Sequence, residues 1–147
     1  MLRGDYNERD GFPQIEASVF YDMHLAVVTL MFDTGATMTM LNAFDAEEIG
    51  IDAQSLQNRT MVAGAGGVSE IKTAAVQIVF EDDGKHRYAY EREVGILPTE
   101  VSRALPSVLG RDILNNWNIR LFPVEGLVEA DVLHCDYSLE NPNNENF

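Results

Sequence analysis

One aspartate, Asp33, lies between two runs of apolar residues in the segment VTLMFDTGATMTML, residues 28–41. An ionised carboxylate at the end of a buried strand costs free energy unless it is paired, hydrogen-bonded or shifted in pKa. Functional sites often use the same conditions to prepare an acid or a base. The Asp-Thr-Gly tripeptide that begins at Asp33 is therefore the feature that most restricts how this chain can fold and act.

Length and composition limit the class of protein. The chain has 147 residues, which fits one domain with a real core. Its 24 aspartates and glutamates against 10 lysines and arginines give a net charge of −14, which argues against nucleic acid or an anionic membrane as a partner. The single cysteine, Cys135, excludes an internal disulfide framework. The sequence shows neither a signal-peptide core nor an apolar run long enough to span a bilayer, so we expect a cytoplasmic protein.

The pattern of apolar residues predicts a mainly β chain. Residues 15–21 and 24–32 are rich in β-branched and aromatic residues, and they predict two strands joined by a tight turn at residues 22–23. Residues 59–97 predict β structure throughout, with a hairpin turn at residues 82–85. The other expected elements are short helices over 42–50 and 111–117 and strands over 118–122 and 126–135.

We expect three parts along the chain. Residues 1–14 are polar and predict a flexible N-terminal arm, and residues 15–122 form the folded domain. No basic residue follows Arg120, so residues 123–147 are expected to be an acidic C-terminal extension made of a strand and a polar tail.

Three short motifs follow one another in the folded domain. Asp33-Thr34-Gly35-Ala36-Thr37 comes directly after a predicted strand. A loop of small residues, AGAGG at 63–67, lies inside a predicted hairpin, and VLGRDIL at 108–114 places an apolar pair and a glycine before a predicted helix. The order of the three motifs is more specific than any one of them alone.

This combination resembles the retropepsin-like aspartic proteases, the single-domain family of retroviral proteases and their cellular relatives. The resemblance covers about residues 15–122. It implies a retropepsin-like closed β-barrel or sandwich with one or two short helices, which forms one half of a two-fold symmetric dimer. It also implies that Asp33 is the catalytic aspartate, that Gly35 and Ala36 support its loop, and that the Thr34 hydroxyl bonds across the dimer axis.

The resemblance assigns the other two motifs as well. The small-residue loop would be the tip of a flap that closes over the substrate, and an extended substrate would add as a strand beneath it. VLGRDIL would pass close to the catalytic loop. The residues implied for substrate binding are Thr37, Ala63, Gly64, Ala65, Gly66 and Gly67, and those implied for the structural motif are Val108, Leu109, Gly110, Arg111 and Asp112.

A working site of this family uses two aspartates, whereas this chain has one Asp-Thr-Gly. Two chains must then meet about a two-fold axis. Two adjacent carboxylates share one proton, so one Asp33 would activate a water as base while the other polarises the scissile carbonyl. The resemblance thus implies an aspartic-type endopeptidase that hydrolyses peptides or proteins as a homodimer, with no metal and no cofactor.

Two features depart from the family pattern. Many viral members carry an aspartate at the position of Thr37, and it pairs with the arginine of the helix motif, so Arg111 needs another partner here. In addition, about 25 residues follow Phe122, whereas short terminal strands seal the viral dimer. The dimer interface can therefore differ from the viral one.

Each motif also has a plain structural interpretation. Asp33 can be a turn aspartate that bonds its own backbone, and residues 63–67 can be a flexible hairpin tip. For Arg111 and Asp112 we favour helix-start electrostatics and a structural salt bridge over a catalytic role. Three histidines and the cysteine match no metal-ligand spacing, so we expect no metal site at His24, His86, His134 and Cys135.

Two other functions share part of this sequence pattern. Asp-Thr-Gly-Ala-Thr also fits a phosphate loop of actin-like ATPases, but that fold needs two large domains and a second phosphate loop, which this chain lacks. A catalytically silent retropepsin-like dimer that binds or scaffolds peptides is the remaining alternative. The retained Asp-Thr-Gly favours the enzyme, because a silent module has no chemical need for that carboxylate.

Overall fold

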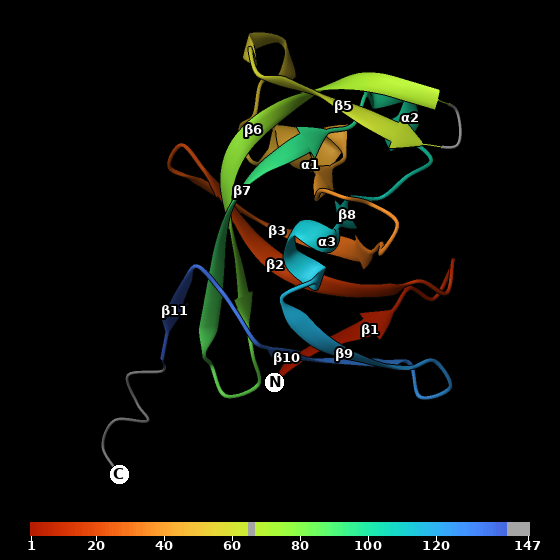
Figure 1. Ribbon diagram of the computed structural model, residues 1–147, viewed down its shortest axis with the longest axis vertical. Coiled ribbons are helices and arrows are strands. Elements are labelled where there is room, and N and C mark those ends of the chain that lie inside the picture. The colour runs from red at the N-terminus through yellow and green to blue at the C-terminus, as the bar shows by residue number, and fades with distance from the viewer. Residues whose placement is uncertain (65–66, 141–147) are drawn as a thin grey trace.

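The computed structural model of the chain describes residues 1–64 and 67–140 (Figure 1). Within these ranges, no helix has the length and apolar character that crossing a membrane requires.

The protein is mainly β, as the sequence predicts. Its helices are short: α1 (Ala43–Glu48), α2 (Thr99–Ser102), α3 (Arg111–Leu114) and one 3₁₀ turn (Ala53–Ser55). The strands are β1 (Leu2–Tyr6), β2 (Pro13–Tyr21), β3 (His24–Phe32), β4 (Met40–Leu41), β5 (Arg59–Gly64), β6 (Gly67–Glu81), β7 (Arg87–Ile96), β8 (Val108–Leu109), β9 (Trp117–Phe122), β10 (Leu127–Val132) and β11 (Tyr137–Leu139).

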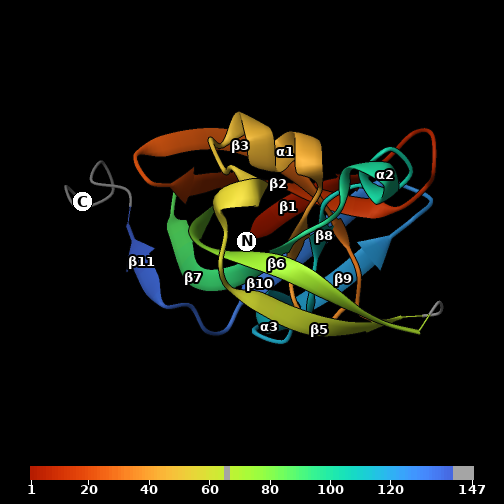
Figure 2. The same cartoon turned by 90° about the horizontal axis from the view of Figure 1, so that it is seen from above.

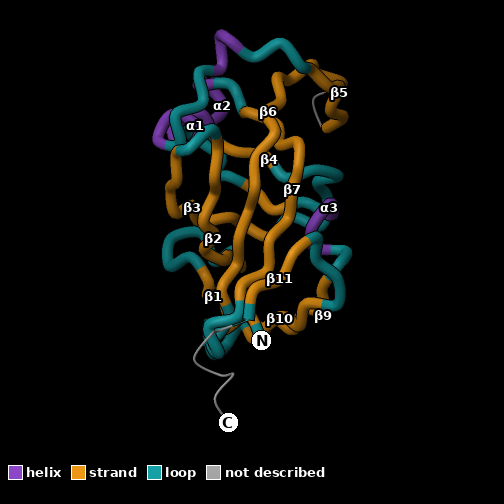
Figure 3. The backbone as a smooth tube through the Cα atoms, turned by 90° about the vertical axis from the view of Figure 1, so that its left-hand side faces the viewer, coloured by secondary structure: helices purple, strands orange, loops and turns teal. Residues whose placement is uncertain are grey.

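Six of the strands close into a barrel, which confirms the predicted fold class. Their order is β6-β7-β4-β8-β3-β2, and β2 pairs back onto β6 through Ser18–Phe20 and Gln77–Val79. The β3–β8 and β4–β7 pairs are parallel, whereas β2–β3 and β6–β7 are antiparallel hairpins. Figure 3 shows β6 and β7 running along the length of the molecule.

Strand alternation fills the barrel with apolar side chains. On β2 and β3, Val19, Val28 and Leu30 point inward and are fully buried. At one end of the core, Phe80 meets Trp117 edge-to-face with ring centroids 4.8 Å apart. Each such buried side chain contributes about 1.5–3 kcal/mol through removal of apolar surface from water.

The two predicted hairpin turns form where expected. The turn between β2 and β3 places Asp22 and Met23 at φ 42° and 68°, the left-handed pair of a tight hairpin. The turn between β6 and β7 contains Lys85 at φ 68°. Asn42 caps α1, because its side-chain oxygen accepts from the amides of the second and third helical residues, Phe44 and Asp45, at 2.9 and 3.0 Å.

The second predicted helix is shorter than expected. α3 ends at Leu114, and Trp117 begins β9 instead of completing a helical face. The Asn116 side chain donates to the carbonyls of Asp112 and Ile113 at 3.2 and 3.1 Å, so it satisfies carbonyls that a longer helix would use.

The N-terminal segment differs from the predicted flexible arm, because its first residues form strand β1. β1 pairs with β10 and β2, and Leu2 is fully buried. Leu2 is the only aliphatic residue of β1, and with Gly4 between it and Tyr6 the strand gives no clear alternation signal, so the sequence did not indicate it. β1, β10 and β9 continue the sheet beyond the barrel (Figure 2).

The C-terminal segment is anchored to the barrel through β7. The Tyr90 hydroxyl donates to the carbonyl of His134 and accepts from the Trp117 indole, both at 2.7 Å. Burial raises the pKa of Tyr90 to about 12. Asp136 accepts from the Glu91 amide at 2.8 Å and pairs with Arg92 at 2.7 Å.

Candidate active site

Asp33 lies at the point where β3 leaves the barrel. β3 and β8 run parallel, and their last paired residues are Phe32 and Leu109. The amide of Asp33 continues this pairing by donating to the carbonyl of Leu109 at 3.0 Å. The Asp33 side chain is half-buried. Two neighbouring strands thus fix the backbone of the aspartate while its carboxylate keeps contact with solvent.

A tight turn orients the Asp33 carboxylate. The amide of Ala36 donates to the Asp33 carbonyl at 3.1 Å, and the amide of Gly35 donates to carboxylate Oδ1 at 2.9 Å. A Cβ on residue 35 would lie 3.2 Å from the same oxygen, which is tight. The structure thus contains the turn aspartate that the sequence raised as a plain structural interpretation, and this turn sets the direction of the carboxylate.

The VLGRDIL segment packs directly against the Asp33 loop. The amide of Arg111 donates to the carbonyl of Ala36 at 2.8 Å. A Cβ on Gly110 would lie 2.5 and 2.6 Å from the carbonyl carbon and oxygen of Met38, so only glycine permits this approach. The glycine of this motif therefore sets how closely β8 and α3 approach the loop.

A buried threonine joins the loop to α3. Thr39 is fully buried, and its hydroxyl donates to Asp112 at 2.8 Å and accepts from the Gly110 amide at 3.1 Å. The Thr39 amide lies 3.0 Å from both carboxylate oxygens of Asp112. Asp112 therefore holds the far end of the loop in place and makes no hydrogen bond with the Asp33 side chain.

Arg111 does not form the salt bridge that we expected. Its guanidinium donates to the carbonyl of Thr34 at 3.1 Å, and no described carboxylate lies within 4.0 Å of it. With Thr37 exposed where an acidic partner would stand, the arginine binds a backbone oxygen next to Asp33 instead. Its role here is to support the loop.

The small-residue loop lies at the end of a two-stranded hairpin. β5 pairs with β6 up to Ala63 with Val68 and Gly64 with Gly67. Gly67 has φ +109°, a conformation that other residues resist. The expected flap residues Ala65 and Gly66 lie outside the described residues. In Figure 1 this hairpin crosses one end of the molecule, with β8 and α3 below it.

Comparisons with known proteins agree with this geometry. The family model described as "Aspartyl protease" matches residues 22–86, which include Asp33 and the β5–β6 hairpin. The structure is similar to a retropepsin-like aspartic protease from Rickettsia conorii, with a TM-score of 0.61, 21% identity and 86% of each chain covered.

The chain has the retropepsin-like fold. The resemblance that the three motifs indicate is thereby confirmed. A second similar structure is an EIAV protease complexed with the inhibitor HBY-793, at a TM-score of 0.46 and 19% identity, covering 74% of this chain and 90% of the other. Among curated proteins, none matches the chain in sequence.

The described residues of this retropepsin-like chain hold no group of three or more histidine, cysteine or acidic side chains that could bind a metal ion. His24 and His86 instead make contacts with residues close to them in the chain. His24 Nδ1 lies 2.9 Å from the carbonyl of Asp22, and His86 lies beside Asp82 with 3.5 Å between Nδ1 and Oδ1.

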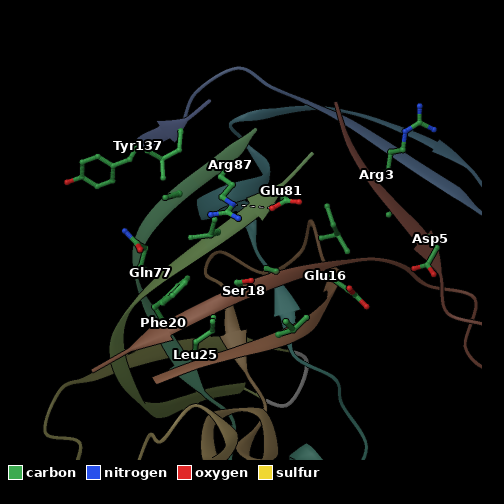
Figure 4. Close-up of a pocket in the computed structure, with 17 residues that line it drawn as sticks. Arg3, Asp5, Glu16, Ser18, Phe20, Leu25, Gln77, Glu81, Arg87 and Tyr137 are labelled. Atoms are coloured by element: carbon green, nitrogen blue, oxygen red, sulfur yellow. Dashed lines mark hydrogen bonds and ion pairs between the residues drawn. The ribbon is translucent and has the colours of Figure 1, made fainter. Parts of the chain in front are cut away.

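Sequence reasoning missed two parts of the retropepsin-like structure. Thr39 looks like an ordinary strand residue, and only its burial beside Asp112 reveals its part in supporting the loop. A groove of about 1020 Å³ also lies on the outer face of the barrel, and none of its lining residues belongs to 33–37, 63–67 or 108–112 (Figure 4). No sequence signal marks it, because residues of six strands (β1, β2, β3, β6, β7 and β11) line it.

Proposed function

We propose that this protein is an aspartic endopeptidase that acts as a homodimer and hydrolyses peptide bonds with a water activated by Asp33. One observation carries the proposal: the Asp33 carboxylate is fixed at the end of β3 by the Gly35 amide, yet it remains half exposed. Among the described residues it has no other side-chain hydrogen bond and no ion pair. A carboxylate that is held in place but otherwise unpaired is available for chemistry.

A single Asp33 is half of the required machinery. Peptide hydrolysis needs a base for the water and an acid for the carbonyl oxygen, and the described loop supplies one carboxylate for both tasks. If two copies bring their Asp33 side chains together, the pair shares one proton because two close carboxylates resist double ionisation. The ionised member takes a proton from water as the water oxygen attacks the scissile carbonyl carbon, and the protonated member gives its proton to the carbonyl oxygen. When the C–N bond breaks, one member donates a proton to the leaving nitrogen and the other takes one from a hydroxyl of the tetrahedral intermediate, so the pair again holds one shared proton.

The surface around Asp33 suits a second copy. The Thr34 hydroxyl is exposed and has no hydrogen-bond partner among residues 1–64 and 67–140. Thr34 adjoins Asp33, so two loops facing each other about a two-fold axis would bring both hydroxyls to the interface. We propose that these hydroxyls bond across the axis and fix the separation of the two carboxylates.

The β5–β6 hairpin supports an extended peptide as substrate. β5 is an edge strand of the sheet, because it pairs only with β6 among the described strands. The exposed side chains of Met61 and Val68 project from the hairpin. An extended peptide can bond to such a strand through its main chain. We propose that Thr37 and residues 63–67 contact the peptide, with the hairpin closing over it.

The deciding experiment measures cleavage of a diverse peptide library across a pH range for wild type, Asp33→Asn and the control Asp10→Asn, whose side chain is exposed on a loop. We expect Asp33→Asn to keep the fold and lose at least about a hundred-fold in rate, while the control cleaves as wild type does. Equal rates for Asp33→Asn and wild type would refute the assignment. A folded wild-type dimer that cleaves no peptide would favour the silent binding module.

A further inference from the structure

The outer face of the barrel carries an apolar groove remote from Asp33. An antiparallel sheet that faces water normally alternates apolar residues inward with polar residues outward. On β3 this rule fails, because Leu25 and Val27 point outward at 56% and 63% exposure while Val28 and Leu30 fill the core. Exposed apolar groups gathered on one face mark an interaction site more often than single ones do.

Several strands contribute side chains of the same kind to this groove. Figure 4 shows Phe20 and Leu25 on one side and Tyr137 on the other, with Arg87 and Glu81 between β6 and β7. The apolar residues that line it are Phe20, Leu25, Val27, Val79, Tyr137 and Leu139. Its volume of about 1020 Å³ lies at the upper end of the range for ligand sites, which run from about 300 to 1,000 Å³.

The charges at the rim are unbalanced. Arg3 pairs with Asp83 and Arg87 pairs with Glu81, each at 3.1 Å, so both lining arginines are already neutralised. Asp5 and Glu16 also line the groove, and neither has a described cation within 4.0 Å. The groove therefore combines apolar walls with carboxylates that lack a positive partner, and it favours an occupant with positive charge.

Strand β11 forms one wall of the groove. It pairs with β7, from Tyr137 with Ala89 to Leu139 with Arg87, and β7 in turn pairs with β6, so the outer edge of β11 faces away from β2 and β3. Tyr137 and Leu139 are two residues apart, so both lie on the face of β11 that lines the groove.

We propose that this groove docks an extended segment of a partner protein in which apolar residues alternate with lysine or arginine. The apolar side chains would lie against Leu25 and Val27 on β3, and a basic side chain would reach Glu16 on the neighbouring β2. This inference concerns a surface outside the Asp33 loop and does not depend on peptide cleavage.

Binding of a defined peptide tests the proposal. The probe is a fluorescein-labelled peptide of about eight residues in which leucine or valine alternates with lysine or threonine. The host is the Asp33→Asn variant, so that cleavage cannot remove the probe. Two groove variants, Leu25→Thr/Val27→Thr and Glu16→Gln, are compared with Val124→Thr, a matched change at an apolar residue 96% exposed on the β9–β10 turn.

We expect saturable binding in fluorescence anisotropy, with amide chemical-shift changes in residues 16–20, 25–27 and 137–139. Leu25→Thr/Val27→Thr should raise the dissociation constant at least about ten-fold, and Glu16→Gln about three-fold with a weaker dependence on salt. Val124→Thr should bind as the host does. A peptide with glutamate in place of lysine should bind at least about ten-fold more weakly.

Three outcomes would overturn the proposal. One is the absence of saturable binding up to millimolar peptide. Another is a set of shifts confined to residues 33–37 and 108–112, which would place the peptide at the Asp33 loop. The third is sedimentation showing that the Leu25→Thr/Val27→Thr change, unlike Val124→Thr, abolishes self-association, which would make the groove a contact between copies of this chain.

Discussion

The hydroxyl of Thr39 lies 2.8 Å from the carboxylate of Asp112, and the amide of the same threonine lies 3.0 Å from each carboxylate oxygen. One acidic side chain thus holds both polar groups of a fully buried residue at the far end of the Asp33 loop. The contact joins positions 73 residues apart in the chain. The rigidity of the loop therefore depends on α3 as much as on its own turn.

Replacing Thr39 by valine should destabilise the protein by about 1–3 kcal/mol, because the change leaves the Gly110 amide and one Asp112 oxygen without their hydroxyl partner. Urea denaturation followed by fluorescence measures the effect. Thr37→Val is the matched control, since Thr37 is exposed and should change the free energy of unfolding by less than about 0.5 kcal/mol. Similar losses for both variants would contradict this role of Thr39.

Gly110→Ala should cost about 3 kcal/mol or more, because its Cβ would lie 2.5 Å from the Met38 carbonyl carbon and the backbone would have to move. Gly84→Ala is the control. Its Cβ would meet only side chains, none closer than 3.2 Å, and we expect a change below about 1 kcal/mol. Thermal and urea unfolding of both variants test the difference, and an unaffected Gly110→Ala would show that the close approach is not required.

Asp136→Asn should lower stability at neutral pH and have little effect in acid. The hydrogen bond from the Glu91 amide lowers the pKa of Asp136, and the nearby positive charge of Arg92 lowers it further. Desolvation acts in the opposite direction but is a smaller effect than the Glu91 bond. A lowered folded pKa gives stability that is present above about pH 4 and lost as the pH falls through the folded value. We expect a loss of about 1 kcal/mol at pH 7 that shrinks below pH 4, measured by urea unfolding. Asp10→Asn should show no such pH-dependent difference.

Gly67→Val should impair peptide cleavage more than Gly126→Val does. Both glycines have positive φ, +109° and +69°, so valine strains each backbone. Gly67 closes the β5–β6 hairpin, whereas Gly126 lies in the β9–β10 turn. If both variants lose similar stability but only Gly67→Val loses cleavage, the flap assignment is supported. If both variants lose cleavage equally, the hairpin contributes to the stability of the fold and not to substrate binding.

Thr34→Ala should weaken the proposed dimer while the monomer remains folded. Each lost hydroxyl would leave a partner in a buried network unsatisfied, at about 1–3 kcal/mol per group. Sedimentation and cleavage across a dilution series should then shift together to higher protein concentration. A wild-type chain that stays monomeric at high concentration and still cleaves peptides would rule out the shared carboxylates.

The mainly β character could be predicted because the strands alternate strongly, whereas the closed barrel was implied by the resemblance that the three motifs carry. β3 begins and ends at the predicted residues 24 and 32, and the capped helix after Asn42 forms where expected. Sequence reasoning missed β1 and β11, which carry too few apolar residues to show a period of two. α2 was also missed, since four residues after a proline give no helical period.

The residues of the Asp33 loop could be predicted from the sequence, but the hydrogen bonds that join them could not. The glycines at 35 and 110 indicated tight backbone, and the structure gives the reason for each in a specific contact. The partners of Arg111 and Asp112 could not be predicted, because they depend on which backbone atoms the fold brings within reach. Arg111 binds a carbonyl and Asp112 binds Thr39, and neither makes the expected salt bridge.

The hairpin of β5 and β6 has a mechanical consequence. The last rung between β6 and β7 is Lys72 with Ile96, and the buried side chain of Ile71 still packs against Gly95, so residues 67–70 project beyond β7 with β5 as their paired strand. At about 3.3 Å per residue, these four residues form a lever about 13 Å long, and a tilt of about 15° at its base would move its end by about 3 Å. If the hairpin opens as proposed, its amplitude is set by where β7 turns away, and lengthening that ladder by one rung would shorten the movement without altering any residue at the tip.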